Sequence, residues 1–278
     1  MAHLALILDL DNTLYSWMDS YAPALRATIK YLAKEIHQPV PIIRDSFKKV
    51  FKAHKSVEVV NMVKELDVWE KTTLCGEKKD EIQNYAQALF LETFKNSLQL
   101  FPDVEKVLSW AKKNGIMLIA FSDARAIWAD FRLQTLNLYP FFEYIYVLKD
   151  EGLPDAVIKQ YPGSVIQYPP EYCKPSPDIY LEIIRKTGIC NNQLFIIGDS
   201  KRKDISPASR LNLSTIWAKY GNNCSSSSKR LLGAVTPWTA SQRASGGGIK
   251  PQYTMDSFSE IISILENNQG GAEECLNI

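Results

Sequence analysis

The chain of 278 residues contains few of the side chains from which proteins build zinc centres or disulfide frameworks. Its five cysteines are widely scattered, and no two of them form a Cys-x-x-Cys pair. Neither a zinc site nor a set of disulfides is therefore indicated, and we expect a reducing, cytoplasmic environment. The three histidines lie in unrelated sequence contexts, and we assign no chemistry to them.

The chain also lacks long apolar runs and an excess of charge. Its apolar stretches are far shorter than the roughly 20 residues that cross a bilayer. Its first residues lack the basic segment and cleavage site of a signal peptide, so we expect none. The formal net charge of +1 does not predict a basic surface for nucleic acid. We expect neither a membrane nor a nucleic-acid partner, and nothing in the sequence indicates the oligomeric state.

What the sequence does contain is a short apolar run that ends in two acidic residues. Residues 4–8 are aliphatic, and the motif Asp-x-Asp-x-Thr follows at 9–13. A short continuous apolar run stopped by polar residues predicts a buried strand. In open parallel sheets the ligand crevice lies outside the carboxyl ends of the strands. Asp9 and Asp11 are therefore candidates for a cation site and a carboxylate nucleophile, although turns also favour Asp.

Two later apolar runs, at 116–121 and 194–197, have the same design. The first ends in a Ser-Asp pair, and the second ends in Gly-Asp-Ser with a further Asp shortly after. Between them a Lys-Pro pair lies in a loop that enters a predicted helix. The polar residues of these segments are Ser122, Asp123, Lys174, Asp199 and Asp204.

The order of these motifs resembles that of the four motifs of the haloacid dehalogenase (HAD) superfamily. They are Asp-x-Asp-x-Thr, the Ser at a strand end, the Lys-Pro pair and Gly-Asp-Ser-x-x-x-Asp. The resemblance covers residues 4–15 and 101–220. Members of that superfamily are mostly Mg-dependent phosphatases. The resemblance implies an α/β fold with a Rossmann-like core, and a helical cap between the first and second motifs over the active site.

The periodicity of the chain supports two domains. Residues 16–100 show helical periodicity without strand alternation and predict a cap domain, with helices over 21–36, 42–51, 57–71 and 77–94. Residues 1–15 and 101–278 alternate strands and helices, which predicts a doubly wound, mostly parallel sheet. Within this core domain, residues 150–173 predict an extended loop, either a rim or lid or a packed surface excursion. Residues 221–250, with runs of Ser and Gly, predict a flexible insertion.

The expected chemistry starts from the charge of a phosphate monoester, which repels an anionic nucleophile. We expect Asp9 to attack phosphorus and form an aspartyl-phosphate, and Asp11 to act as general acid and base. The resemblance implies the same two roles. True dehalogenases of the superfamily lack the second aspartate, so Asp11 favours phosphoryl transfer over cleavage of a carbon–halogen bond.

The remaining motif residues are expected to balance charge around the phosphoryl group. Ser122 donates its hydroxyl, and Lys174 places a positive charge on the phosphate. Mg²⁺ prefers oxygen ligands, and we expect Asp9, the backbone carbonyl of Asp11 and Asp199 to supply them.

Less specific expectations concern the charged residues around these motifs. Asp204 either orients a water or pairs with Lys174. Asp123 stands where the family usually has Asn, and it either points away from the anion site or pairs with Arg125. The basic run 201–203 either faces solvent or attracts anionic substrates.

The leading prediction is a Mg-dependent phosphatase that hydrolyses a small phosphorylated metabolite. Two alternatives stay open: a phosphomutase with the same chemistry, and a non-catalytic binding or regulatory protein with the same fold. The sequence contains no motif that identifies the substrate.

Overall fold

A computed structural model describes residues 4–152, 161–237 and 248–269. Close contacts divide the chain into two compact units. The first, called the core unit below, comprises Met1–Ser16, Leu100–Asn223 and Ala244–Ile278. The second, called the helical unit, comprises Trp17–Gln99 and Cys224–Arg243. Each unit is described by itself.

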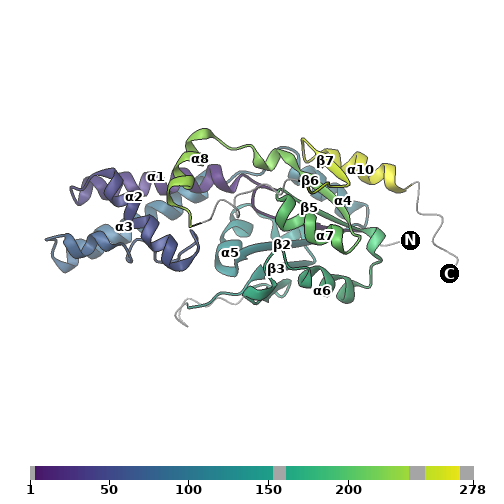
Figure 1. Cartoon of the computed structure of the whole chain (residues 1–278), viewed down its shortest axis with the longest axis horizontal. Helices are drawn as coiled ribbons and strands as arrows, with labels where there is room; N and C mark the ends of the chain where they lie inside the picture. Colours follow the sequence, from purple (N-terminus) through teal and green to yellow (C-terminus); the bar gives the residue numbers. More distant parts are fainter. Residues whose placement is uncertain (1–3, 153–160, 238–247, 270–278) are drawn as a thin grey trace. The chain divides into compact units, whose positions relative to one another are not determined.

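The described part of the core unit is built on a seven-stranded sheet in the order β4-β3-β2-β1-β5-β6-β7 (Figure 1). Every neighbouring pair is parallel. The strands are β1 Ala5–Leu8, β2 Met117–Arg125, β3 Tyr144–Leu148, β4 Val165–Tyr168, β5 Leu194–Gly198, β6 Ser214–Ala218 and β7 Tyr253–Met255. This arrangement confirms the predicted α/β class with a doubly wound, parallel sheet.

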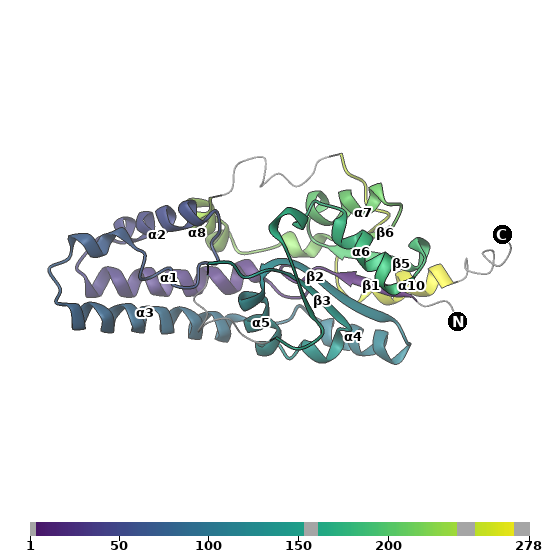
Figure 2. The ribbon, with the colours of Figure 1, turned by 90° about the horizontal axis from the view of Figure 1, so that it is seen from below.

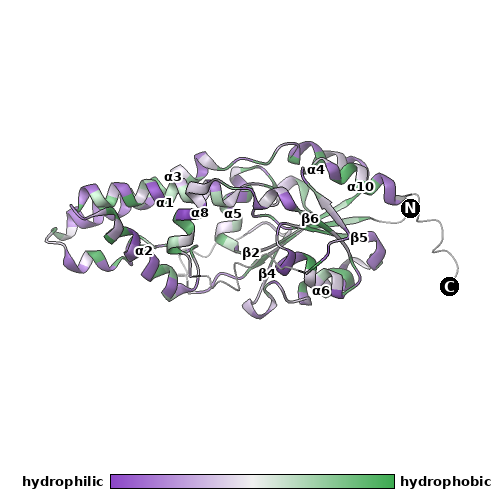
Figure 3. Cartoon of the chain, turned by 45° about the horizontal axis from the view of Figure 1, so that its top comes forward, coloured by the Kyte–Doolittle hydropathy of each residue, from purple (hydrophilic) through white to green (hydrophobic). Residues whose placement is uncertain are grey.

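Helices connect these strands and cover the sheet. They are α4 Val104–Lys113, α5 Ala126–Thr135, α6 Asp178–Thr187, α7 Ser206–Arg210 and α10 Glu260–Gln269. Figure 3 shows the strands coloured as hydrophobic, whereas many helices alternate hydrophobic and hydrophilic colour along their length. On one face, Ile179 and Ile183 of α6 pack with Ile7 of β1 in a single apolar cluster. Parallel strands need such cover on both faces, which explains why their sequences are continuously apolar.

The central strand, β1, determines where polar side chains gather. Leu8 is in register with Ala120 of β2 on one side and with Ile197 of β5 on the other. The segments that follow these positions therefore meet at one edge of the sheet. The strand order also reverses around β1, which is the place where open α/β sheets bind ligands.

The helical unit contains α1 Trp17–Glu35, α2 Val40–His54, the short 3-10 helix η1 Asp67–Lys71, α3 Gly76–Ser97 and α8 Ser226–Val235. Helices α1 and α3 lie side by side (Figures 1 and 2). Tyr21 of α1 packs edge-on against Phe90 and Phe94 of α3, with ring centroids 5.1 and 5.6 Å apart. Aromatic pairs of this geometry contribute about 0.5–1.5 kcal/mol beyond burial.

The prediction of a helix over 57–71 was wrong, because only Asp67–Lys71 forms a short helix there. Side chains bind backbone carbonyls in this segment: the hydroxyl of Tyr21 donates to the carbonyl of Val57, and the indole of Trp69 to that of Val63. The apolar residues are buried as expected, but burial of their side chains did not require helical backbone.

The prediction of a flexible insertion over 221–250 was also wrong for most of its described part. Residues Ser226–Val235 form α8, which belongs to the helical unit and contacts α1 and α2. Residues 238–247 lie outside the described residues. In the predicted loop 150–173, Val165–Tyr168 forms strand β4 at the end of the sheet, and 153–160 lie outside the described residues.

In the part of the chain that the structure covers, no helix combines the length and apolarity needed to cross a membrane.

Candidate active site

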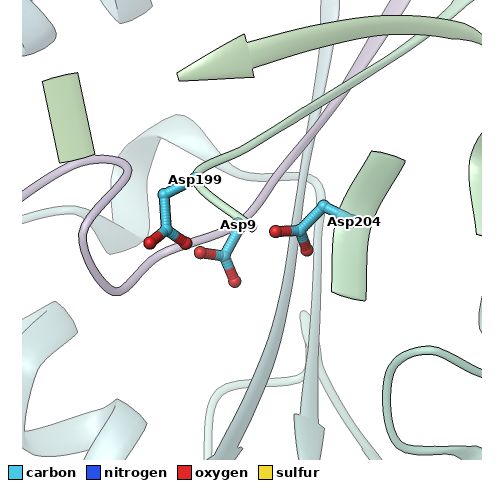
Figure 4. A group of neighbouring side chains, drawn as sticks. All are labelled: Asp9, Asp199 and Asp204. Carbon is cyan, nitrogen blue, oxygen red and sulfur yellow. The ribbon is translucent and has the colours of Figure 1, made fainter. Parts of the chain in front are cut away.

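Three carboxylates converge at the edge of the sheet where β1 and β5 end. Asp9 follows β1, Asp199 follows β5, and Asp204 lies in the one-turn π-helix η6 Lys201–Ile205. Figure 4 shows their carboxylates side by side, with that of Asp9 between the other two. One oxygen from each lies within 4.8 Å of the other two. The parallel register of β1 and β5 is what brings two of them together.

The ammonium group of Lys174 lies between two of these carboxylates. Its Nζ is 2.6 Å from Oδ1 of Asp9 and 2.8 Å from Oδ1 of Asp204. The same Nζ lies 4.6 Å from the centre of the Phe121 ring. Of the two roles predicted for Asp204, the pair with Lys174 is therefore formed. A buried charge of this kind is stable only when it is paired.

One lysine does not balance three clustered carboxylates, and the pKa values reflect this. Burial raises the pKa of Asp9 to about 7; the charge of Lys174 opposes this rise, and that of Asp204 adds to it. Burial and the charges of Asp9 and Asp204 raise the pKa of Asp199 well above its ordinary value. Burial would lower the pKa of Lys174, but Asp204 and Asp9 together raise it well above the usual range.

This donor set fits a hard divalent cation. Mg²⁺ is bound by carboxylate oxygens together with waters and phosphate, and three clustered carboxylates exceed the single positive charge that the Lys174 ammonium supplies in contact with them. The cluster contains Asp9 and Asp199, two of the predicted ligands. Asp204, for which a direct ligand role was not predicted, lies beside them. The predicted contribution of Asp11 is its backbone carbonyl, which stays a prediction.

Thr13 holds the first and fourth motifs together, a role that the sequence analysis did not assign to it. Its hydroxyl donates to Oδ2 of Asp9 at 3.1 Å and accepts the amide N–H of Asp199 at 3.1 Å. The hydroxyl of Tyr220 donates to the carbonyl of Thr13 at 2.6 Å. The motif Asp-x-Asp-x-Thr indicated this contact, because its Thr follows the first Asp by four residues, close enough for a hydrogen bond across the turn.

Two glycines allow these segments to approach so closely. A Cβ on Gly198 would lie 2.3 Å from Cγ of Asp204. A Cβ on Gly221 would lie 1.9 Å from the carbonyl oxygen of Asn12 and 2.8 Å from Cβ of Asp199. Real Cβ atoms do not approach other atoms this closely, so both positions need glycine.

The carboxylate of Asp11 lies next to a buried arginine. Nε of Arg132, on α5, is 3.3 Å from Oδ1 of Asp11. The Arg132 side chain is 0% exposed, whereas that of Asp11 is 25% exposed. The sequence analysis missed Arg132, because nothing in the residues around it indicated that this side chain faces inward. A guanidinium at this place puts a positive charge beside the Asp11 carboxylate.

Asp123 does not pair with Arg125, which was one of the two predicted possibilities. Its Oδ1 accepts the backbone N–H of Lys174 at 2.9 Å and the hydroxyl of Tyr168 at 3.1 Å. Its Oδ2 forms an ion pair with Nζ of Lys203 at 2.8 Å. Arg125 instead donates to the carbonyl of Glu151 at 3.0 Å, outside this group.

These contacts explain why an acid is tolerated at position 123. Burial raises the pKa of Asp123, but the charges of Lys203 and Lys174 and their hydrogen bonds outweigh it and hold the pKa below its ordinary value. The basic run 201–203 therefore contributes Lys203 to the site. Neither predicted role for that run, a solvated face or attraction of substrates, anticipated this pairing.

Ser122 lies inside β2 rather than after it, because the strand continues to Arg125 with an irregular register beyond Ser122. Its hydroxyl accepts the amide N–H of Ala124 at 3.2 Å, and its carbonyl accepts the hydroxyl of Tyr168 at 2.8 Å. Ser122 follows Phe121, the ring beneath Lys174. It is therefore positioned at the same sheet edge as the carboxylates.

Comparison with known proteins agrees with this architecture. The family model described as haloacid dehalogenase-like hydrolase matches residues 3–212, and a second, HAD-hydrolase-like model matches 171–260. The chain belongs to the haloacid dehalogenase-like hydrolase family.

Two relatives share part of the sequence. A glyceraldehyde 3-phosphate phosphatase of Pyrococcus furiosus is 25% identical over 124 residues, which is 45% of this chain and 44% of that protein. A phosphoglycolate phosphatase of Pseudomonas putida is 23% identical over 147 residues, or 52% of this chain and 47% of that protein. The chain thus spans about half the length of the curated relatives that it matches.

Solved structures resemble the whole chain in fold. The HAD-family hydrolase YfnB of Bacillus subtilis, solved with bound magnesium, has a TM-score of 0.54 at 17% identity, covering 96% of this chain and 100% of that one. A 2-haloacid dehalogenase of Pseudomonas syringae has a TM-score of 0.59 at 17% identity, covering 96% and 99%. At these identities the likeness shows the fold alone.

Proposed function

We propose that this protein is a Mg²⁺-dependent phosphatase that hydrolyses a small phosphorylated metabolite through an aspartyl-phosphate. The observation that carries the proposal is the position of Asp9 and Asp11 directly after the central strand, with Lys174 2.6 Å from the Asp9 carboxylate. Family membership supports hydrolysis. The names of the two relatives, both phosphatases acting on small phosphate esters, support the substrate class.

In the first step, a carboxylate oxygen of Asp9 attacks phosphorus while the bond from phosphorus to the ester oxygen breaks. The hydrogen bond from Thr13 to Oδ2 of Asp9 holds the carboxylate in one orientation. A fixed nucleophile avoids the entropy loss of aligning it in every turnover. Asp11 donates its proton to the leaving oxygen, so the alcohol departs neutral.

In the second step, Asp11 takes a proton from water, and the oxygen of that water attacks phosphorus. The bond from phosphorus to the Asp9 oxygen breaks, and inorganic phosphate and the free carboxylate are restored. The partial exposure of Asp11 suits this role, because its side chain reaches water while the Arg132 guanidinium lies beside it. Asp9 is more buried, which suits a group that must not be solvated before attack.

Two further residues stabilise the charge that develops on the phosphoryl oxygens. Lys174 offers an ammonium group beside the nucleophile, and Ser122 offers a hydroxyl. The carboxylates of Asp9 and Asp199 and the carbonyl of Asp11 would hold Mg²⁺, with Asp204 beside them. When bound, the ion neutralises phosphoryl charge and offsets its repulsion with Asp9.

The presence of Asp9, Asp11, Ser122 and Lys174 together argues against the non-catalytic alternative. The phosphomutase alternative shares the first step and differs in the acceptor of the phosphoryl group. It predicts a long-lived adduct on Asp9 that is released by a sugar phosphate rather than by water.

The test is hydrolysis of p-nitrophenyl phosphate by the full chain, with Mg²⁺ or with EDTA. We expect Mg²⁺-dependent turnover that Asp9→Asn abolishes. The matched control is Asp103→Asn, an exposed aspartate of the core unit whose positive φ also suits Asn. Native turnover that survives Asp9→Asn would overturn the proposed nucleophile.

A second measurement separates the phosphatase from a mutase. The protein is quenched in acid during turnover, and peptides are searched by mass spectrometry for a phosphoryl group on Asp9. An adduct that water alone discharges supports the phosphatase. An adduct that persists until glucose phosphate is added supports the mutase.

A further inference from the structure

The helical unit contains a hollow that belongs to none of the motifs described above. It lies among helices α1, α2 and α8 and has a volume of about 320 Å³. This is at the lower end of the roughly 300–1,000 Å³ typical of small-molecule sites. Every residue that lines it belongs to the helical unit.

Four cationic side chains line the hollow, and no acidic one does. Arg26 is held in place because its Nη2 donates to the carbonyl of Ser227 at 3.2 Å. Arg44 pairs with Asp45 on the surface, and an exposed pair of this kind is weak. Lys30 and Arg230 have no ion-pair partner within the described part of the chain.

The surface between these cations is apolar. It is formed by Ile29 of α1, Val40 of α2, and Leu231 and Ala234 of α8. Val40 is 48% exposed, so much of its apolar surface is open to a ligand. Inorganic anions and phosphodiester backbones have no apolar part that would cover such a surface. A ligand that combines an anionic group with an apolar body would use both features.

Positive charge is concentrated on the three helices that surround the hollow. Together α1, α2 and α8 carry nine Lys and Arg against three Asp and Glu, although the whole chain is close to neutral. A concave site among like charges raises the local concentration of counter-ions. The helices therefore favour an anionic ligand over a neutral one.

Helix α8, which forms one wall of the hollow, is anchored to α1. The backbone N–H of Ser225 donates to the carboxylate of Asp19 at 3.1 Å, and its hydroxyl donates to the same carboxylate at 2.7 Å. Ser225 also caps α8 by accepting the N–H of Ser228. Leu232 and Val235 are buried on the inner face of α8. The third wall is thus fixed by a cap and by apolar packing.

We propose that this hollow is a binding site for a small amphiphilic anion, in which a carboxylate, sulfonate or phosphate is attached to an apolar body. The cations bind the anionic group through charge-assisted hydrogen bonds. The apolar body of the ligand covers Val40 and Leu231. The inference is independent of the proposed phosphatase function, because none of the motif residues lines the hollow.

The test uses 1-anilinonaphthalene-8-sulfonate as the anionic probe and N-phenyl-1-naphthylamine, which lacks the sulfonate, as its neutral counterpart. Fluorescence titrations of the full chain are expected to show one site for the sulfonate and weaker binding of the neutral compound. The double variant Lys30→Gln/Arg230→Gln is expected to weaken sulfonate binding about tenfold or more. Lys229→Gln, next to Arg230 on the exposed side of α8, is the matched control and should leave the affinity unchanged.

A second variant, Ala234→Met, fills the hollow while all the cations remain, and it too should weaken binding. Equal binding of the two probes, equal loss in Lys229→Gln, or no loss in the double variant would overturn the proposal. The double variant could instead lose binding to an oligonucleotide or an anionic vesicle while it binds the sulfonate as the native chain does. That result would overturn the proposal in favour of a polyanionic partner.

Discussion

At the scale of residues, the site depends on Lys174, whose side chain and backbone are both bound by aspartates. The ammonium of Lys174 contacts Asp9 and Asp204, while its backbone N–H is held by Asp123. Asp123 is in turn held by Lys203. The chain of contacts joins the second, third and fourth motifs, so a change at Lys203 is transmitted to a group beside the nucleophile.

We expect Lys203→Met to lower kcat/KM about tenfold, because small misplacements of a catalytic group reduce the rate strongly. Lys203→Arg should restore part of the activity, since it keeps the charge beside Asp123. Steady-state kinetics with p-nitrophenyl phosphate measures both. The matched control is Lys201→Met, since Lys201 lies over the Trp217 ring instead of Asp123. Equal loss in the two Met variants would contradict the role given to Lys203.

A second prediction at this scale concerns Cys173, the residue before Lys174. Burial, with a contribution from Asp123, raises the pKa of the Cys173 thiol to about 11. Only the thiolate reacts, so alkylation by iodoacetamide at pH 8 should be about tenfold or more slower than for the exposed Cys190. The rate should keep rising as the pH approaches 11. Site-resolved mass spectrometry measures each rate, and comparable rates for the two native thiols would disprove the assignment.

At the scale of elements, the site depends on how closely separate segments approach. The turn after β1, the segment after β5 and the short helix η7 Lys219–Asn222 meet around Thr13 and Gly221. The hydrogen bonds that join them connect residues 186 and 207 positions apart in the sequence. A side chain placed between these elements would move the carboxylates.

We expect Gly221→Ala to lower the free energy of unfolding by about 1–3 kcal/mol, the usual effect of overpacking. It should also reduce activity, because its Cβ would overlap the Asn12 carbonyl and crowd Asp199. The contrasting variant is Gly233→Ala in α8, where a Cβ meets nothing within 4 Å. In that helix interior Ala should stabilise by about 0.5–1 kcal/mol. Urea unfolding compares the two, and a neutral Gly221→Ala would refute the close approach.

At the scale of the whole molecule, the buried carboxylates oppose folding unless their charge is neutralised. The pKa of Asp9 is about 7 in the folded protein, above the ordinary value of 3.8 expected in the unfolded chain. Between these two values the folded state binds more protons than the unfolded state. Stability contributed by this group is therefore present at low pH and lost as the pH rises.

In EDTA we expect the free energy of unfolding to fall as the pH rises from about 4 to about 7, the interval between the two pKa values of Asp9. Adding Mg²⁺ should restore stability near pH 7 and have little effect near pH 4, because protons compete with the metal there. Asp9→Asn should flatten the pH dependence, and Asp103→Asn should not. A pH profile that is the same with EDTA and Mg²⁺ would argue against a metal at these carboxylates.

Much of the fold and part of the site could be predicted from local sequence. The apolar runs at 4–8, 116–121 and 194–197 were predicted as strands, because a short, continuous run of apolar residues is visible in the local sequence alone. The polar residues that follow such strands must meet at one edge of a parallel sheet. That geometric rule was enough to select Asp9 and Asp199 before any contact was known.

The sequence by itself determined which residue types lie at the ends of the buried strands, because strand formation and burial follow the local pattern of apolar side chains. Only the tertiary structure decided which charges pair. Asp123 binds Lys203 rather than the nearby Arg125, and Arg132 turns inward to Asp11. It also decided that residues 226–235 form a helix on α1, anchored by Ser225 to Asp19. These partners lie far apart along the chain, and a contact between distant residues depends on how the elements pack.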